Sequence, residues 1–482
     1  MALDLKSKPY VALGQKGQET MIRIFRHYVS PVKVTLAVTD FLGVSAAVFL
    51  AEWARYSWLG YEADIGWQAF AAKLLVPLIF IPILLGVGGY QSDSIRDMRV
   101  FAARLFTAII VASIVLAAFL YLLPMLPLWR SILLLAMLLS GLILLGVHGF
   151  FVLSADSKFL SRRVLILGAG NEAQEIESFA KKATEAGLNI IASICMPGQK
   201  SVVENPVSLT DLDDLVSFAE SKETELILIA ADGFEPLPLE SLIACKLAGI
   251  EIKDRLSFFE QARGFVNLSA VKAEWIVFSD GFRGGNSFER VAKRILDIVI
   301  SLIMLVATAP ILVIAALAVR FTSFGPIFYR QRRVGLNGKG FYLFKFRSMK
   351  NDAEKKGAPE WAKENDPRVT LVGSFLRRTR IDELPQLLNV LKGDMSFVGP
   401  RPERPYFVKQ LEKKIPFYSE RHCLKPGITG WAQIQFPYGA SFDDSKRKLE
   451  YDLYYIKNYS IFLDILIILQ TVRVVLFPIG VR

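Results

Sequence analysis

Two adjacent carboxylates, Asp382 and Glu383, stand directly after a run of arginines. Residues 384–391 carry apolar side chains that suit a helix, and a glycine stop follows, so the pair lies at the N-terminal edge of a predicted helix. Such a pair often serves only to cap a helix and to balance its dipole. Arg377 and Arg380 favour another use, because arginines beside a helix N-terminus make a site for phosphate oxygens.

Carboxylates in this setting support two kinds of phosphate chemistry. A pair of them can hold Mg²⁺, which binds diphosphate and neutralises charge during transfer. One of them can also act as a covalent nucleophile on phosphorus. Bare carboxylates would repel a diphosphate, so the arginines and a metal ion have to offset that repulsion. The cluster therefore indicates transfer of a phosphate ester.

Three further motifs supply cations and polar groups. Arg401 stands between two prolines, whose stiff backbone favours a fixed guanidinium. Lys425 opens the stretch KPGITGWAQ, which ends at Gln433 and offers backbone and side-chain donors to a nucleotide or sugar. Lys345 and Arg347 add cations in the stretch KFRSM. Each of these motifs alone is equally typical of a solvated surface.

The elements that position these groups begin with a membrane block. The chain is 52% hydrophobic with a formal net charge of +11, which suits an anionic membrane surface or phosphate substrates. Lys and Arg gather before the first apolar stretch, between the second and third, and after the fourth, so both ends of the block are predicted to be cytoplasmic. Four stretches are each close to the roughly 20 residues that span a bilayer: Val34–Leu50, Leu74–Tyr90, Leu105–Leu123 and Ile132–Leu153.

Residues 160–265 alternate predicted strands, at 163–167, 189–195 and 225–230, with helical segments, which indicates a parallel, doubly wound sheet. The pattern Gly168-x-Gly170-x-x-Ala173 follows the first strand, as in dinucleotide-binding folds. The second strand, Asn189–Cys195, ends without an acidic residue for a ribose. This absence favours a degenerate Rossmann-like module over an NAD site.

Residues 293–320 form a fifth apolar run, broken by Pro310. Cations flank it on both sides, so a helix that dips into one leaflet and returns is favoured over a full span. The tail, Ile461–Leu476, fits either a helix in the membrane interface or an ordinary core helix, and the sequence leaves both open.

Residues 288–482 resemble the bacterial sugar transferase domain of the polyprenyl-phosphate hexose-1-phosphate transferases, and the whole chain resembles the large membrane form of that family. The resemblance implies an α-helical membrane bundle over 1–155, a Rossmann-like α/β domain over 160–265, and a mixed α/β membrane-associated catalytic domain over 288–482 with a re-entrant helix. Six motifs in family order carry it, at 293–297, 331–335, 345–349, 382–394, 399–402 and 425–433.

The resemblance also implies a role for each site residue. Asp382 would attack the β-phosphorus of a UDP-sugar, release UMP, and pass the sugar phosphate to polyprenyl (undecaprenyl) phosphate. Glu383, with help from Asp382, would position Mg²⁺. Ala309 departs from the serine that usually precedes the proline of the helix break. Substrate binding is expected of the remaining polar motif residues, namely Lys345, Arg347, Arg377, Arg380, Arg401, Lys425 and Gln433.

The resemblance implies three partners: a UDP-sugar, polyprenyl phosphate and lipid of the bacterial inner membrane. The catalytic domain is expected to face the cytoplasm. The expected reaction is the first membrane step of exopolysaccharide, capsule or O-antigen synthesis. No nucleic acid is expected, since no basic and aromatic surface module is evident. A nucleotide-sugar dehydratase would need a TGxxGxxG turn and a Tyr-x-x-x-Lys pair on a catalytic Rossmann domain, and an assembly scaffold would not need Asp382. The sugar and the oligomeric state, a homodimer included, stay open. Three dispersed cysteines argue against disulfides and zinc: Cys195, Cys245 and Cys423.

Overall fold

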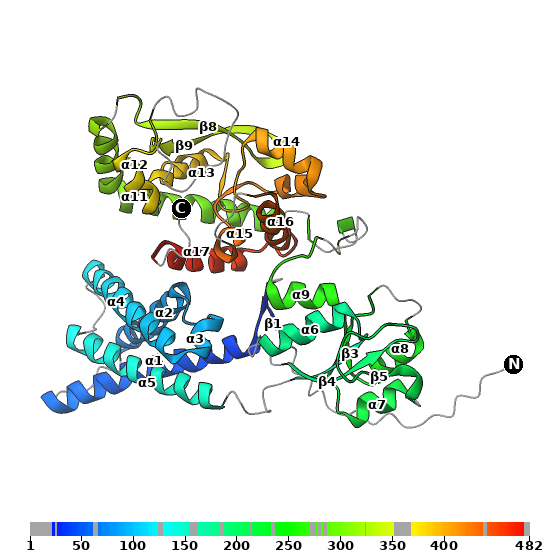
Figure 1. Ribbon diagram of the computed structural model, residues 1–482. Coiled ribbons are helices and arrows are strands. Elements are labelled where there is room, and N and C mark those ends of the chain that lie inside the picture. Colours follow the sequence, from blue (N-terminus) through cyan, green and yellow to red (C-terminus); the bar gives the residue numbers. More distant parts are fainter. Residues whose placement is uncertain are drawn as a thin grey trace. The chain divides into compact units, whose positions relative to one another are not determined.

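The computed structural model places the chain in two compact units (Figure 1). The small unit comprises residues 1–22 and 157–258, and the large unit comprises residues 23–156 and 259–482. The residues that the structure describes are 22–24, 27–60, 66–123, 129–154, 162–182, 188–212, 214–232, 237–268, 271, 276–277, 281–282, 287–322, 324–350, 368–436 and 441–476.

The first part of the large unit is helical and apolar, as predicted (Figure 1, blue to cyan). Each helix starts before its predicted stretch, whereas α2 and α4 end slightly before theirs, and α1 continues until Gly60, whose φ of 72° stops it. Five described helices, these four and α11, are long and apolar enough to cross a membrane, which indicates membrane association. The four are α1 (Pro31–Leu59), α2 (Trp67–Val87), α4 (Met98–Leu122) and α5 (Arg130–Ser154), with the short α3 (Ser92–Arg96) between α2 and α4.

Two buried polar contacts link the helices of this block. Asp40 Oδ2 accepts a hydrogen bond from Tyr90 Oη at 3.0 Å and lies 2.9 Å from His148 Nε2. Lys73 Nζ lies 2.6 Å from Glu52 Oε2. An isolated charge is costly in an apolar environment, so these pairs lower the cost of placing charged side chains between the helices.

The small unit contains a five-stranded parallel sheet in the order β5-β4-β3-β6-β7. The strand of this sheet that comes first in the sequence, β3, thus lies in the centre, which is the arrangement of a doubly wound sheet. The predicted strands at 163–167, 189–195 and 225–230 correspond to β3, β4 and β6 within one residue at each end. The strands are β3 (Arg162–Leu167), β4 (Leu188–Cys195), β5 (Val207–Ser208), β6 (Leu226–Ile229) and β7 (Glu251–Asp254), with α6 (Asn171–Lys182), η3 (Leu209–Asp211), α7 (Leu215–Ser221) and α8 (Leu239–Leu247) between them, and α9 (Arg255–Arg263) follows.

The second part of the large unit mixes helices with two pairs of strands. β8 and β9 form an antiparallel hairpin, and β10 and β11 pair in parallel. The mixed α/β character agrees with the prediction. The elements are α11 (Ser287–Thr322), β8 (Phe328–Val334), η4 (Leu336–Gly338), β9 (Gly340–Phe346), α12 (Leu371–Arg378), η5 (Ile381–Glu383), α13 (Gln386–Lys392), β10 (Ser396–Val398), α14 (Pro405–Lys414), η6 (Tyr418–Cys423), β11 (Gly427–Thr429), α15 (Trp431–Gln435), α16 (Phe442–Lys457) and α17 (Ile461–Leu476).

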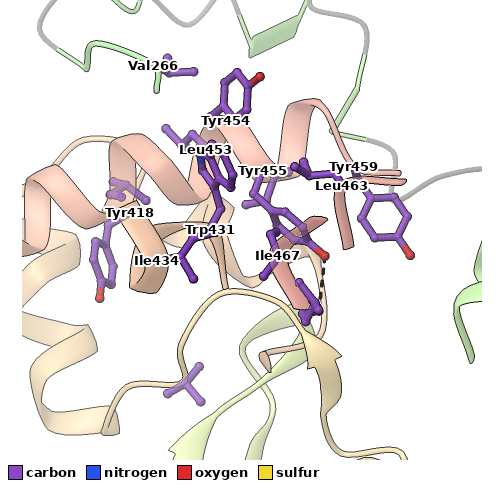
Figure 2. Packing of buried hydrophobic residues seen from close by; sticks show 14 of the residues in the cluster. Val266, Tyr418, Trp431, Ile434, Leu453, Tyr454, Tyr455, Tyr459, Leu463 and Ile467 are labelled. Atoms are coloured by element: carbon purple, nitrogen blue, oxygen red, sulfur yellow. Dashed lines mark hydrogen bonds between the residues drawn. The ribbon is translucent and has the colours of Figure 1, made fainter. Parts of the chain in front are cut away.

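An aromatic cluster forms the core of this part (Figure 2). The rings of Trp431 and Tyr454 stack with centroids 5.9 Å apart. Leu463 and Ile467 of α17 are fully buried in the same cluster. Of the two interpretations left open for the tail, the structure therefore favours a core helix on this face of α17.

The predicted break at Pro310 is wrong, because α11 continues through this proline as one helix: a proline removes one backbone hydrogen bond but need not end a long apolar helix. In its first turns, Lys293 Nζ lies 3.1 Å from Asp297 Oδ1 and 2.9 Å from Asp464 Oδ2 of α17. Asp297 Oδ1 also accepts a hydrogen bond from Ser396 Oγ of β10 at 3.1 Å. These residues explain the motif at 293–297 as a buried ionic network that joins α11 to β10 and α17.

The far end of α11 is held by the same part of the large unit. Arg347, which follows β9, donates through Nη1 to the Phe324 carbonyl at 2.9 Å and through Nη2 to the Val319 carbonyl at 3.5 Å. Val319 also packs with Phe346 and Leu376. Both ends of α11 therefore contact one folded body.

Candidate active site

The two carboxylates lie in a short turn between α12 and α13. The prediction placed them at the edge of a helix that starts at Leu384, whereas the helix proper starts at Gln386. Arg380 has a left-handed backbone (φ 60°), and the Leu384 amide donates to the Ile381 carbonyl, so the chain makes a separate 3-10 turn before the helix. This turn buries both carboxylates, with Asp382 6% and Glu383 9% exposed.

Glu383 is surrounded by cations from distant parts of the chain. Its Oε1 lies 2.7 Å from Lys345 Nζ on β9, 2.7 Å from Arg401 Nη2, and 4.0 Å from Arg380 Nη1. Burial raises the pKa of Glu383, but the charges of Arg401, Lys345 and Arg380 outweigh it and hold the pKa well below its usual range. Glu383 is therefore ionised and pairs with the cations around it.

Asp382 is the opposite case. Within the part of the chain that the structure describes, its carboxylate makes no hydrogen bond and no ion pair. Burial raises the pKa of Asp382 to about 6; Lys345, Arg380 and Arg377 oppose this shift, while the charge of Glu383 adds to it. The two neighbouring carboxylates thus differ: Glu383 is paired with cations, whereas Asp382 has no partner among the described residues.

Asn389 positions Lys345, and sequence reasoning missed it. Its side chain is fully buried on α13, where Oδ1 accepts from the Phe344 amide at 3.0 Å and Nδ2 donates to the Tyr342 carbonyl at 2.8 Å. The amide thereby bonds the free edge of β9 as a strand would. A polar residue amid the apolar stretch of residues 384–391 was the available signal.

A second missed pair supports Arg401. Arg421 Nη2 donates to the Arg401 carbonyl at 3.0 Å and to Asp452 Oδ2 at 2.7 Å. Burial raises the pKa of Asp452 to about 6 although Arg421 is its partner. Since both side chains of the pair are buried, it fixes the backbone from which the Arg401 guanidinium reaches Glu383.

Of the remaining expected site residues, Arg377 acts on Asp382, whereas Arg347, Gln433 and Lys425 have their described contacts elsewhere. Arg377, in the last turn of α12, is close enough for its charge to lower the pKa of Asp382. Arg347 instead holds the end of α11, as described above. Gln433 Nε2 donates to the Ile428 carbonyl at 3.1 Å, while its Oε1 is buried without a partner among the described residues. Lys425 lies near Arg294 at the other end of α13.

The donor set at 382–383 fits Mg²⁺. No described group of three or more His, Cys, Asp or Glu side chains could hold a metal ion by itself. Mg²⁺ does not require such a group, since it is usually bound by one or two carboxylates, water and substrate phosphates. Asp382 is a buried carboxylate without a partner among the described residues, and Glu383 is adjacent.

The glycine turn of the small unit is filled by the chain itself. A Cβ on Gly170 would lie 1.8 Å from Asp232 Oδ2. Asp232 Oδ1 accepts from the Glu172 amide in the first turn of α6 at 3.0 Å, and Gln199 Nε2 donates to Asp232 Oδ2 at 3.2 Å. The position where a dinucleotide phosphate would meet a helix N-terminus thus carries a carboxylate.

Comparison with known proteins agrees with this geometry. Residues 288–478 match the family described as bacterial sugar transferase. A Bacillus subtilis protein named putative undecaprenyl-phosphate N-acetylgalactosaminyl 1-phosphate transferase is 54% identical over 129 residues, which are 27% of this chain and 72% of that protein. The chain therefore belongs to the bacterial sugar transferase family.

Two longer relatives are matched over only part of their length. A UDP-N-acetylgalactosamine-undecaprenyl-phosphate N-acetylgalactosaminephosphotransferase of Aeromonas hydrophila is 47% identical over 190 residues, which are 39% of this chain and 45% of that protein. A UDP-glucose:undecaprenyl-phosphate glucose-1-phosphate transferase of Xanthomonas campestris pv. campestris is 35% identical over 322 residues, 65% of this chain and 66% of that protein. The second match is too long to be confined to residues 288–482, so it extends into the preceding part of the chain.

Proposed function

We propose that the chain is a phosphoglycosyl transferase that moves a hexose-1-phosphate from a UDP-sugar to undecaprenyl phosphate and releases UMP. The observation that carries this proposal is the difference between Asp382 and Glu383. Glu383 neutralises cations that a nucleophile would otherwise pair with, and Asp382 stays free to attack. The names of relatives with glucose and with N-acetylgalactosamine leave the sugar open between these classes.

The reaction proceeds in two displacements. A carboxylate oxygen of Asp382 attacks the β-phosphorus, the bond from that phosphorus to the bridging oxygen breaks, and UMP leaves with the bonding electrons. A phosphate oxygen of undecaprenyl phosphate then attacks the phosphorus of the aspartyl-phosphosugar, and the Asp382 carboxylate is released. The product is an undecaprenyl diphosphosugar, and the enzyme returns to its starting state.

The cations around the turn stabilise charge in both displacements. Arg401 and Lys345 each meet Glu383 at 2.7 Å, so they are fixed before substrate arrives. Arg377 and Arg380 act on Asp382 by charge, and they would stabilise substrate phosphates that approach it. Mg²⁺, held by Asp382 and Glu383, would neutralise diphosphate oxygens when bound.

We also propose that α11 is re-entrant. Its first turns contact β10 and α17, while its last turns contact Arg347 and Phe346. A full span would place these ends on opposite sides of roughly 30 Å of hydrocarbon, which a single folded body cannot bridge. The catalytic part would then lie on the cytoplasmic face of the inner membrane, on the side predicted from the loop charges.

The small unit is, on the same reasoning, a degenerate Rossmann-like domain without a dinucleotide. Its strand order supports the fold, and Asp232, which follows β6 and contacts the glycine turn, opposes a phosphate by both volume and charge. The small unit would then serve in packing or in regulation. We propose the same three domains as the sequence analysis, at residues 1–155, 160–265 and 288–482.

The test incubates the full chain in nanodiscs with a panel of UDP-sugars and undecaprenyl phosphate, and identifies the nucleotide released. We expect UMP with one class of sugar, complete dependence on Mg²⁺, and, without acceptor, at most one UMP per chain. Release of UDP would show that the sugar alone is transferred and would overturn the proposal. A Glu412→Gln variant, which changes an exposed carboxylate on α14, serves as the control and should match the parent.

A further inference from the structure

A pair of cations lies at the C-terminal end of α13, at the opposite end of that helix from the Asp382 turn. Gly393 closes α13 with a left-handed backbone (φ 95°). A Cβ placed on Gly393 would lie 3.7 Å from Arg294 Nη2 and 3.8 Å from Lys425 Nζ. Both cations therefore face the same small region of space above this glycine.

The two cations are not neutralised to the same degree. Arg294 donates to the Val390 carbonyl at 2.6 Å and to the Leu391 carbonyl at 2.7 Å, which uses two of its five N–H groups. Lys425 makes no hydrogen bond and no ion pair within the described residues. Burial and the charge of Arg294 lower the pKa of Lys425, whereas Asp297 and Asp394 raise it. An anion bound between Arg294 and Lys425 would relieve this repulsion.

The same region borders an apolar surface of α11. Val291 and Ile298 stand three residues before and four residues after Arg294, so all three side chains lie on one helix face. Both apolar side chains are exposed, and so is Leu302, one turn further along that face. A ligand that fits here combines an anionic head with an apolar chain.

We propose that Arg294 and Lys425 bind the phosphate of a lipid whose hydrocarbon chain lies along the exposed face of α11. The inference rests on the proposed function and adds to it a lipid-phosphate subsite separate from the cations at Glu383. Two lipids share this chemistry: the polyprenyl phosphate acceptor and an acidic phospholipid. The subsite would deliver the acceptor from the membrane toward Asp382 or sense the surrounding head groups.

Lys425→Gln is the informative change, because the Lys425 side chain makes no hydrogen bond and no ion pair among the described residues. In phosphatidylcholine nanodiscs, we expect it to raise the KM for undecaprenyl phosphate about tenfold, while the KM for the UDP-sugar and the UMP burst without acceptor stay unchanged. Lys425→Arg should restore the acceptor KM. Lys409→Gln, at an exposed position on α14, is the matched control.

A second arm adds phosphatidylglycerol to the nanodiscs. If the subsite takes phospholipid head groups, this lipid changes the parent rate, and Lys425→Gln removes that response without altering the acceptor KM in neutral discs. Either pattern supports the subsite and identifies its ligand. Identical behaviour of parent and variant in both lipids, or a change confined to the UDP-sugar KM, would overturn it.

Native mass spectrometry of the detergent-purified chain supplies a readout that needs no transfer activity. We expect the parent to retain a phosphate-bearing lipid and Lys425→Gln to lose most of it, with Lys409→Gln unchanged. Equal retention by all three refutes the subsite even if the chain releases no UMP. A parent that releases no UMP but shows the expected retention contradicts the proposed function alone.

Discussion

Two turns of the chain combine a carboxylate with a motif typical of phosphate binding. In the large unit, Asp382 and Glu383 follow an arginine run, and three cations converge on Glu383. In the small unit, Asp232 lies against the glycine turn before α6 and accepts the amide hydrogen bond that a phosphate would accept. One turn therefore gathers positive charge around a free carboxylate, while the other uses its carboxylate to close the site.

The difference shows that motif spacing alone does not decide whether a phosphate binds. Both turns precede a helix, and both look suitable in the sequence. What separates them is the partner of the carboxylate: side-chain cations from β9 and from residue 401 in one case, backbone and amide donors in the other. Replacing Asp382 and replacing Asp232 should therefore affect the transfer rate differently.

The largest expected effect comes from making the same substitution in both turns. Asp382→Asn should lower UMP release by on the order of 10⁴-fold, because it removes the nucleophile. Asp232→Asn should leave the rate within about twofold. Initial rates of UMP formation in nanodiscs measure both. Comparable losses in the two variants would contradict the assignment of chemistry to one turn only.

Glu383→Gln should have the next largest effect, about 10²- to 10³-fold on kcat/KM, since Lys345 and Arg401 lose the group that positions them. It should also displace the pH profile. In the parent, the rate should fall as pH drops below about 6, where Asp382 becomes protonated. Because the charge of Glu383 raises the pKa of Asp382, this acidic limb should move to lower pH in the variant. A limb that stays in place, or moves up, would show that another group controls it.

Asp382→Asn should also stabilise the fold. Burial raises the pKa of Asp382 to about 6, so the folded chain binds this proton more tightly than the unfolded chain does, and ionisation destabilises the fold as pH rises through 6. We expect the variant to gain on the order of 1–3 kcal/mol at pH 8. Thermal melting at pH 8 and pH 5 should show a difference that shrinks at the lower pH. A lower melting temperature for the variant at pH 8 would argue against a desolvated carboxylate.

The smallest expected effect is on the stability of the small unit. Asp232→Asn removes a negative charge from the N-terminus of α6, which should cost about 0.5–1 kcal/mol. Hydrogen exchange in α6 should report this loss. Calorimetric titration of the parent with NAD⁺ should give no saturable heat. Micromolar binding would contradict the conclusion that Asp232 excludes a dinucleotide phosphate from the glycine turn.

The sequence predicted the elements better than the site contacts. The strands near 163 and 189 and the tail helix at 461–476 were located closely because hydrophobic pattern and turn residues are local signals. Gly393 was also identified correctly as a helix stop. The break between the turn at 382 and α13 was not, since apolar spacing does not distinguish a 3-10 turn from the first turn of a helix.

The site itself depends on contacts across the chain that local patterns do not contain. That Lys345 and Arg401 pair with Glu383 and not with Asp382 is decided by β9 and by the loop held by Arg421. Arg347 lies two residues from Lys345, so alternation along a strand would place both side chains on one face. The Arg347 side chain instead bonds the Phe324 carbonyl just after α11, because β9 has ended at Phe346. Asn389 could be noticed as polar within an apolar helix, but its partner strand could not.

The ionic network at the start of α11 has a consequence for biogenesis. Lys293 and Asp297 emerge from the ribosome long before Asp464, the residue that completes their set of partners. During synthesis the first turns of α11 therefore form before α17 can supply Asp464. A chain that stops short of that helix would leave Lys293 with one acidic partner in place of two, so α11 acquires its complete ionic anchor only after α17 has been translated.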